Sequence, residues 1–217
     1  ETHQLLPEGD DLWAATSAGL VRYSPQTGRS RVFVHDPEDP GSLSNDVVFS
    51  LFRDSRGTLW AGTASGLNRL EADSTFSHRG IAGAIPSAAI YSIAEDERGS
   101  LWMGTNRGLL RLDPAGRGGV DFRVYDGTSG VGNLEFNRNA VLRATDGTLF
   151  FGGDRGVTHF RPSHIHEKAH AGPVVVTRVL RSTRDGTREE RFVGPEGITL
   201  APSDYTVTVE LAALNFI

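Results

Sequence analysis

LWAATSAGLVRY from Leu12, LWAGTASGLNRL from Leu59, LWMGTNRGLLRL from Leu101 and LFFGGDRGVTHF from Leu149 are variants of one segment. The aromatic residue after each leucine recurs at spacings of 47, 42 and 48 residues, at Trp13, Trp60, Trp102 and Phe150. Repeats of roughly 40–50 residues that each hold several short strand patterns are typical of β-propeller blades. The sequence therefore predicts an all-β protein with a partial β-propeller of about four blades. We expect the four aromatic residues to form the repeated core between the blades.

Each repeat carries the pattern of a four-stranded antiparallel sheet. In the second repeat, residues 47–52 are a β-branched and aromatic run of the kind that a buried innermost strand requires. A polar turn at residues 54–57 leads to a second strand at 59–63, in which Gly62 allows neighbouring backbone to approach closely. Further strands are expected at 67–70 and near Phe76, and the third repeat follows the same order.

The fourth repeat offers only three strands, because residues 157–160 run directly into Pro162. The outer edge of that blade is therefore expected to be unpaired, and an open edge invites pairing with another strand. We predict that a strand from upstream of Glu1 completes the blade in a longer protein. The chain by itself is expected to form an open arc that exposes apolar flanks and is prone to aggregate.

The last quarter of the chain lacks the repeat. Residues 164–171 are polar and rich in histidine, which indicates a linker. Strand patterns at 174–180, 197–200 and 205–211 follow, the last with clear period-two alternation. We therefore predict a propeller region at 1–163 and the truncated start of a β-sandwich at 172–217. The chain begins and ends within strand-like runs, so we expect it to be a fragment.

Composition excludes several classes of function. The net charge is −5 and no basic stripe is present, so nucleic acid is not an expected partner. Cysteine is absent, which removes disulfides and thiolate chemistry. No apolar run approaches the roughly 18 residues that suggest a membrane helix.

Catalytic motifs are also missing. The sequence has no G-x-S-x-G elbow, Walker A loop or H-E-x-x-H helix, so we predict no catalytic residue and no cofactor. His164, His166, Glu167 and His170 fall in the polar linker and are read as solvated, with no metal site. Asp54 and Asp96 begin turns that resemble sialidase Asp-boxes with one extra residue, and we interpret both as structural turns.

A ligand site is expected where the loops enter the innermost strands, because these loops surround the mouth of a propeller's channel and ligands favour concave openings. The same polar residue types are ordinary turn formers, which is the alternative interpretation. The candidate ligand-binding residues are Asn45, Asp46, Ser87, Asn133, Glu135, Asn137 and Arg138. Their hydrogen-bonding groups would suit a small polar solute.

Three segments resemble a known family. SLSNDVVFSLFRDSRGTLWAGTASGLNRL from Ser42 and IPSAAIYSIAEDERGSLWMGTNRGLLRL from Ile85 resemble the two-component regulator propeller repeat, and NLEFNRNAVLRATDGTLFFGGDRGVTHFRPSHI from Asn133 resembles its last copy. GPVVVTRVL and ITLAPSDYTVTVELAALNFI resemble the opening of the Y_Y_Y β-sandwich domain that follows such propellers.

This resemblance implies the ligand-sensing, non-catalytic region of a signalling protein, located in the periplasm and anchored in the inner membrane. The implied output domain is a sensor histidine kinase or a diguanylate cyclase, and the implied partners are an oligosaccharide or other small polar ligand and a second copy joined through the sandwich. Two alternatives stay open: a propeller enzyme (lyase, lactonase or glycan-acting hydrolase) and a secreted scaffold. The downstream reading frame would distinguish them.

Overall fold

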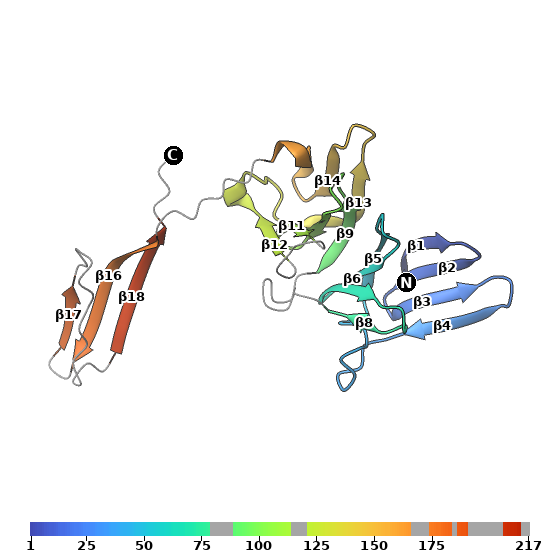
Figure 1. Ribbon diagram of the computed structural model, residues 1–217, viewed down its shortest axis with the longest axis horizontal. Coiled ribbons are helices and arrows are strands. Elements are labelled where there is room, and N and C mark those ends of the chain that lie inside the picture. Colours follow the sequence, from blue (N-terminus) through green and yellow to red (C-terminus); the bar gives the residue numbers. More distant parts are fainter. Residues whose placement is uncertain (79–88, 114–120, 166–173, 184–185, 191–205, 214–217) are drawn as a thin grey trace. The chain divides into compact units, whose positions relative to one another are not determined.

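The computed structural model describes residues 1–78, 89–113, 121–165, 174–183, 186–190 and 206–213 (Figure 1). The chain divides into two compact units, Glu1–Ile165 and His166–Ile217. The candidate strand at 197–200 and the histidine-rich linker after Ile165 lie outside the described residues.

The first unit consists of consecutive antiparallel sheets in which neighbouring strands follow the chain order. The first sheet holds β1 (Thr2–Glu8), β2 (Asp11–Thr16), β3 (Gly19–Ser24) and β4 (Arg29–Phe33), and the second holds β5 (Val48–Arg53), β6 (Leu59–Thr63), β7 (Gly66–Leu70) and β8 (Phe76–Ser77). The third holds β9 (Ile90–Glu95), β10 (Leu101–Thr105), β11 (Gly108–Asp113) and β12 (Asp121–Tyr125), and the fourth holds β13 (Phe136–Arg143), β14 (Leu149–Gly153) and β15 (Gly156–Phe160).

These sheets confirm the predicted fold class, a partial β-propeller with one sheet per repeat. The fourth sheet has three described strands, as expected, and β15 forms its outer edge. The 3₁₀ turns η1 (Gly127–Ser129) and η2 (Pro162–His164) are the only helical elements among the described residues.

The second unit contributes a three-stranded sheet of order β17-β16-β18. Its strands are β16 (Val174–Thr183), β17 (Gly186–Glu190) and β18 (Thr206–Ala213). β16 and β18 correspond to sequence-predicted strands, whereas β17 was not predicted because GTREE is too polar to show an alternating pattern. The assignment of this unit to a β-sandwich remains a prediction.

The tryptophans occupy equivalent buried positions at the interfaces between sheets, with exposed fractions of 2% for Trp13, 6% for Trp60 and 1% for Trp102. Trp13 packs in one cluster with Leu59 of the second sheet. The same arrangement continues along the unit, because Trp60 shares a cluster with Leu101 and Trp102 shares one with Leu149.

The leucine and the aromatic residue of each pair therefore face opposite sides of their sheet, as the alternation of a strand requires. Each tryptophan faces the next sheet, and Leu59, Leu101 and Leu149 each face the previous one. Phe150, at the fourth tryptophan position, is only partly buried, because none of the described residues forms a sheet beyond it.

Close approach of the innermost strands depends on Gly62. A Cβ atom at this position would lie 2.4 Å from Ser50 Oγ and 2.7 Å from the carbonyl oxygen of Ile90 in the next sheet. Ser50 Oγ donates to that same carbonyl at 3.2 Å. The prediction that Gly62 admits neighbouring backbone is confirmed.

Candidate ligand site at the innermost strands

Each innermost strand of the first unit carries a β-bulge near its beginning. The pairing register skips His3 in β1, Phe49 in β5 and Tyr91 in β9. The irregularity in β13 lies between Phe136 and Val141 and contains Asn139, whose φ is +54°. Bulges re-aim side chains and occur often beside functional sites.

The bulge residues contact one another across successive sheets. The ring of Phe49 stacks against the imidazole of His3 with centroids 5.5 Å apart, and its centroid lies 5.2 Å from that of Tyr91. The guanidinium of Arg138 lies 4.3 Å from the Phe49 centroid, which is a cation–π distance. We call these residues, with Asn139, the inner-strand cluster.

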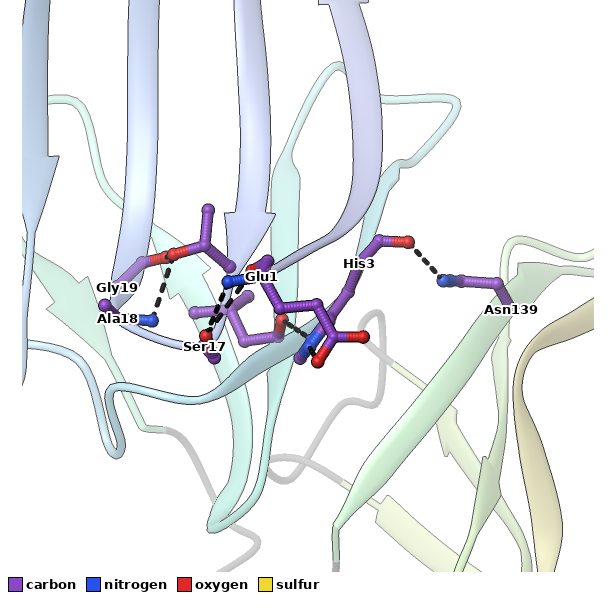
Figure 2. A network of polar contacts seen from close by, with 8 residues as sticks. Glu1, His3, Ser17, Ala18, Gly19 and Asn139 are labelled. Carbon is purple, nitrogen blue, oxygen red and sulfur yellow. Dashed lines mark hydrogen bonds and ion pairs between the residues drawn. The ribbon is translucent and has the colours of Figure 1, made fainter.

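Asn139 joins the first and fourth sheets. Its Nδ2 donates a hydrogen bond of 3.0 Å to the carbonyl oxygen of His3, as Figure 2 shows. The two residues are 136 positions apart in the sequence, so the contact brings the innermost strands of the first and last sheets of this unit to one place.

The imidazole of His3 is held in a defined orientation. Its Nδ1 lies 2.9 Å from the carbonyl oxygen of Val48, so Nδ1 carries the proton and donates it. Its Nε2 lies 3.8 Å from a carboxylate oxygen of Glu1, and the side chain is 5% exposed. His3 and Phe49 therefore form a buried base for the cluster, whereas Arg138 and Asn139 are exposed above it.

The cluster combines aromatic surface with donors. Arg138 forms no ion pair within the part of the chain that the structure describes. Its guanidinium N–H groups can therefore donate hydrogen bonds to a ligand. The exposed carboxamide of Asn139 and the partly exposed phenol of Tyr91 add further polar groups. Such an arrangement can hold a polar solute by hydrogen bonds beside the partly exposed ring of Tyr91.

The sequence-predicted site residues are distributed over several places. Arg138 belongs to the cluster, and Asn137 is its exposed neighbour on β13.

Asn45 donates to Ser65 Oγ at 3.1 Å. Asp46 accepts from the backbone N–H of His35 at 2.7 Å, and Glu135 is exposed with its carbonyl bound to the N–H of Asp154. Ser87 lies outside the described residues, and ligand roles for this set remain predictions.

Asn133 stabilises the turn between β14 and β15 of the fourth sheet. In the first three sheets a threonine closes the turn after the second strand, for example Thr63, whose Oγ1 donates to the carbonyl of Gly66 and accepts from the N–H of Ser65. The fourth sheet has Gly153 instead, and a Cβ there would lie 2.7 Å from Asn133 Cγ.

The carboxamide of Asn133 makes the equivalent contacts from the neighbouring loop. Nδ2 donates to the carbonyl of Gly156 at 3.2 Å and to Thr158 Oγ1 at 2.9 Å, and Oδ1 accepts from the N–H of Arg155 at 2.9 Å. Asn133 is therefore 3% exposed and committed to the framework of the fourth sheet.

Sequence reasoning missed His3, Phe49, Tyr91 and Asn139. A signal was present, because Phe49, Tyr91 and Asn139 each stand eleven positions before the aromatic residue of their repeat, and His3 stands ten positions before Trp13. Alternation within a strand does not reveal these side chains, because a bulge changes which way one residue points.

Apart from the cluster, a hollow lies between the third and fourth sheets, beside the edge strand β15. It encloses about 310 Å³ and is lined by the aromatic side chains of Trp102, Tyr125 and Phe160. The Tyr125 hydroxyl is buried there and has no hydrogen-bond partner among the residues that the structure describes. The hollow occupies the region where the other sheets carry an outer strand.

Three carboxyl groups at exposed turns, away from the cluster, have lowered pKa values. Hydrogen bonds from Thr75, Thr128 and Thr148 lower the pKa values of Asp73, Asp126 and Asp146, respectively. The described residues bring together no group of three potential metal ligands, and none of their helices could span a membrane.

Comparisons with known proteins agree with the predicted propeller repeat. Residues 42–65 and 84–107 match the model of the Two component regulator propeller family. Over 58 residues the chain is 40% identical to Histidine kinase P4 of Formosa agariphila, a match that covers 26% of this chain and 4% of that protein.

The fold resembles crystal structures of sensor regions. The extracellular domain of the hybrid two component system BT3049 from B. thetaiotaomicron aligns with a TM-score of 0.64 at 21% identity, covering 94% of this chain and 30% of that domain. Streptogramin B lyase aligns with a TM-score of 0.52 at 17% identity over 89% of this chain and 70% of the enzyme. The chain thus spans less than a third of the sensor domain, and these likenesses establish the propeller fold.

Proposed function

We propose that this chain is the extracytoplasmic, ligand-sensing region of a membrane-bound signalling protein and is itself non-catalytic. The observation that carries the proposal is the pair of Two component regulator propeller repeats, which lie in a chain whose fold resembles an extracellular sensor domain. The similarity to Histidine kinase P4 supports a histidine kinase as the output, with a diguanylate cyclase as the alternative.

The inner-strand cluster is the proposed sensing site. It gathers side chains from all four innermost strands, so a ligand bound to Arg138 and Asn139 rests on a cluster that joins every sheet of the first unit. Such a ligand would stabilise one relative arrangement of the sheets over others, which is the requirement for a binding event to shift a conformational equilibrium.

Ligand binding is tested by thermal unfolding of the chain with a panel of neutral oligosaccharides, acidic oligosaccharides and amino acids. A ligand at 100 times its Kd should stabilise the protein by about 2.7 kcal/mol. We expect Arg138→Ala to reduce this stabilisation and Arg155→Ala, a change at an exposed arginine away from the cluster, to leave it unchanged. A probe that stabilises wild type and Arg138→Ala equally would show that the inner-strand cluster is not its binding site.

The propeller enzymes are the second candidate function, because streptogramin B lyase and a gluconolactonase share the fold, each with a TM-score of 0.52. Assays of the chain on streptogramin, lactone and glycan substrates distinguish the two. Turnover that is lost in a variant of the inner-strand cluster would replace the sensor proposal by an enzymatic one. Location in the periplasm and dimerisation through the second unit are parts of the sensor proposal and are tested on the full-length protein.

A further inference from the structure

The first two junctions between sheets each contain a hydrogen bond from one innermost strand to the next. Gln4 of β1 bonds the backbone of Leu51 in β5 through both ends of its carboxamide, with Nε2 donating at 3.1 Å and Oε1 accepting at 2.7 Å. Ser50 of β5 donates from Oγ to the carbonyl oxygen of Ile90 in β9 at 3.2 Å. Gln4 and Ser50 hold equivalent positions, because each pairs with the residue two places after the tryptophan of its own sheet. We call this hydrogen bond the inner contact of a junction.

The third junction lacks an inner contact. Ser92 of β9 holds the equivalent position, because it pairs with Gly104, two places after Trp102. Ser92 is 1% exposed, and its Oγ has no hydrogen-bond partner among the residues that the structure describes. The fourth sheet is nevertheless close, since a Cβ atom at Gly104 would lie 2.9 Å from Cβ of Phe136. A buried hydroxyl without a partner destabilises the arrangement in which it occurs, so a small displacement that supplies a partner is favourable.

The turns at the ends of the innermost strands show the same difference between junctions. At the first junction Glu8, the last residue of β1, forms an ion pair with Arg53, the last residue of β5. At the second junction Glu95, the last residue of β9, accepts from the backbone N–H of Ser55 at 2.8 Å and from its hydroxyl at 2.7 Å. Arg53 and Glu95 each stand seven positions before the tryptophan of their sheet. We call this bond the turn contact of a junction.

The third junction lacks a turn contact as well. Arg143 stands seven positions before the aromatic residue of the fourth sheet, and Glu97 holds the place of Ser55 in the third sheet. Both side chains are exposed, and they form neither an ion pair nor a hydrogen bond with each other. What joins these two sheets is apolar packing, for example of Trp102 against Leu149.

We propose that the junction between the third and fourth sheets is a joint, at which the fourth sheet slides against the third while the first three sheets keep their arrangement. Apolar packing is not directional, so it permits small sliding movements, whereas the inner and turn contacts of the other junctions fix one register between sheets. Sliding of packed elements is a common form of conformational change, and it takes place in microseconds to milliseconds.

The joint lies beside the proposed sensing site. β13 belongs to the sliding sheet and carries Arg138 and Asn139, which contact Phe49 of the second sheet and the carbonyl oxygen of His3 in the first. A movement of the fourth sheet therefore changes the inner-strand cluster, and a ligand held by Arg138 and Asn139 stabilises one position of the joint over others. This role in sensing rests on the proposed function, whereas the joint itself does not.

The tryptophans provide one reporter for each junction. Trp13, Trp60 and Trp102 are the three tryptophans of the chain, and they lie at the first, second and third junctions. The chain labelled with 5-fluorotryptophan should therefore give one fluorine NMR resonance per junction, each assigned by its tryptophan-to-phenylalanine variant. Relaxation dispersion detects exchange between conformations in microseconds to milliseconds. We expect an exchange contribution at Trp102 and none at Trp13 or Trp60.

A double variant that supplies the missing turn contact provides the decisive measurement. Glu97→Ser/Arg143→Glu copies the pair of Ser55 and Glu95 at the third junction and should remove the exchange contribution at Trp102. Both positions are exposed, so the folded state tolerates the changes. Glu97→Gln/Arg143→Lys alters the same positions without supplying the contact and should leave the exchange as in wild type.

The measurement needs no ligand, so the joint and the proposed function are tested separately. Absence of exchange at Trp102, equal exchange at all three tryptophans, or exchange at Trp102 that persists in Glu97→Ser/Arg143→Glu would overturn the joint and leave the proposed function standing. An oligosaccharide that binds through Arg138 without changing the exchange at Trp102 would overturn the role of the joint in sensing.

Discussion

The indole Nε1 of Trp60 donates a hydrogen bond of 2.8 Å to Oδ2 of Asp54, the residue that begins the preceding turn. The other carboxylate oxygen accepts from the backbone N–H groups of Arg56 and Thr58. Asp96 holds Trp102 in the same way, at 2.9 Å. The interpretation of both aspartates as structural turn residues follows from this geometry.

In the fourth sheet the aspartate and the indole are replaced together. Ala144 occupies the aspartate position and Phe150 the tryptophan position, so the acceptor and the donor are absent together. The backbone turn is nevertheless retained, because the N–H of Ala144 still donates to the carbonyl of Thr148. A buried carboxylate without its donors would be costly.

Asp54→Ala should destabilise the first unit by about 2–4 kcal/mol, because the buried indole N–H and two backbone N–H groups lose their acceptor. Urea unfolding followed by tryptophan fluorescence measures the change. The double variant Asp54→Ala/Trp60→Phe, which copies the fourth sheet, should cost less than the sum of the two single changes. Additive losses in the free energy of unfolding would show that the two residues contribute independently. Asp10→Ala, a change at an exposed position, is the control.

Gly62→Ala should destabilise the protein by about 1–3 kcal/mol through overpacking, because the new methyl group has no space between Ser50 and the backbone of Ile90. Gly132→Ala is the matched control, since a Cβ at that position meets no atom within 4 Å. Equal midpoints of urea unfolding for the two variants would contradict the close approach of the second and third sheets.

Asn133→Ala should lower stability by about 1–3 kcal/mol, since it leaves the N–H of Arg155 and the carbonyl of Gly156 without their side-chain partner. Asn137→Ala, at an exposed position on β13, is the comparison and should change little. If Asn133→Ala instead kept full stability and abolished binding of a probe from the oligosaccharide panel, Asn133 would be a ligand residue rather than a framework residue.

Acid should weaken the turn at Asp146. Hydrogen bonds from the backbone and side chain of Thr148, together with Arg161, hold the folded-state pKa of Asp146 below its ordinary value. A lowered pKa stabilises the folded state above the unfolded-state pKa of about 3.9, and this contribution is lost as pH falls through the folded-state value. Asp146→Asn should therefore flatten the pH dependence of the unfolding midpoint below about pH 4. An unchanged slope would show that Asp146 is not linked to folding.

The repeat, the strands within it and the three-strand pattern of the fourth repeat could be predicted from the sequence, because each depends on local patterns that recur at a fixed period. Gly62 and the turns at Asp54 and Asp96 were likewise interpretable from residue type and spacing. Three relationships could be seen only in the folded chain: the leucine and the tryptophan of each pair serve different interfaces, Asn133 replaces a threonine, and His3, Phe49 and Asn139 lie together. Those relationships join residues from different repeats or depend on bulges. Neither packing between sheets nor a change in side-chain direction produces a periodic pattern in the sequence.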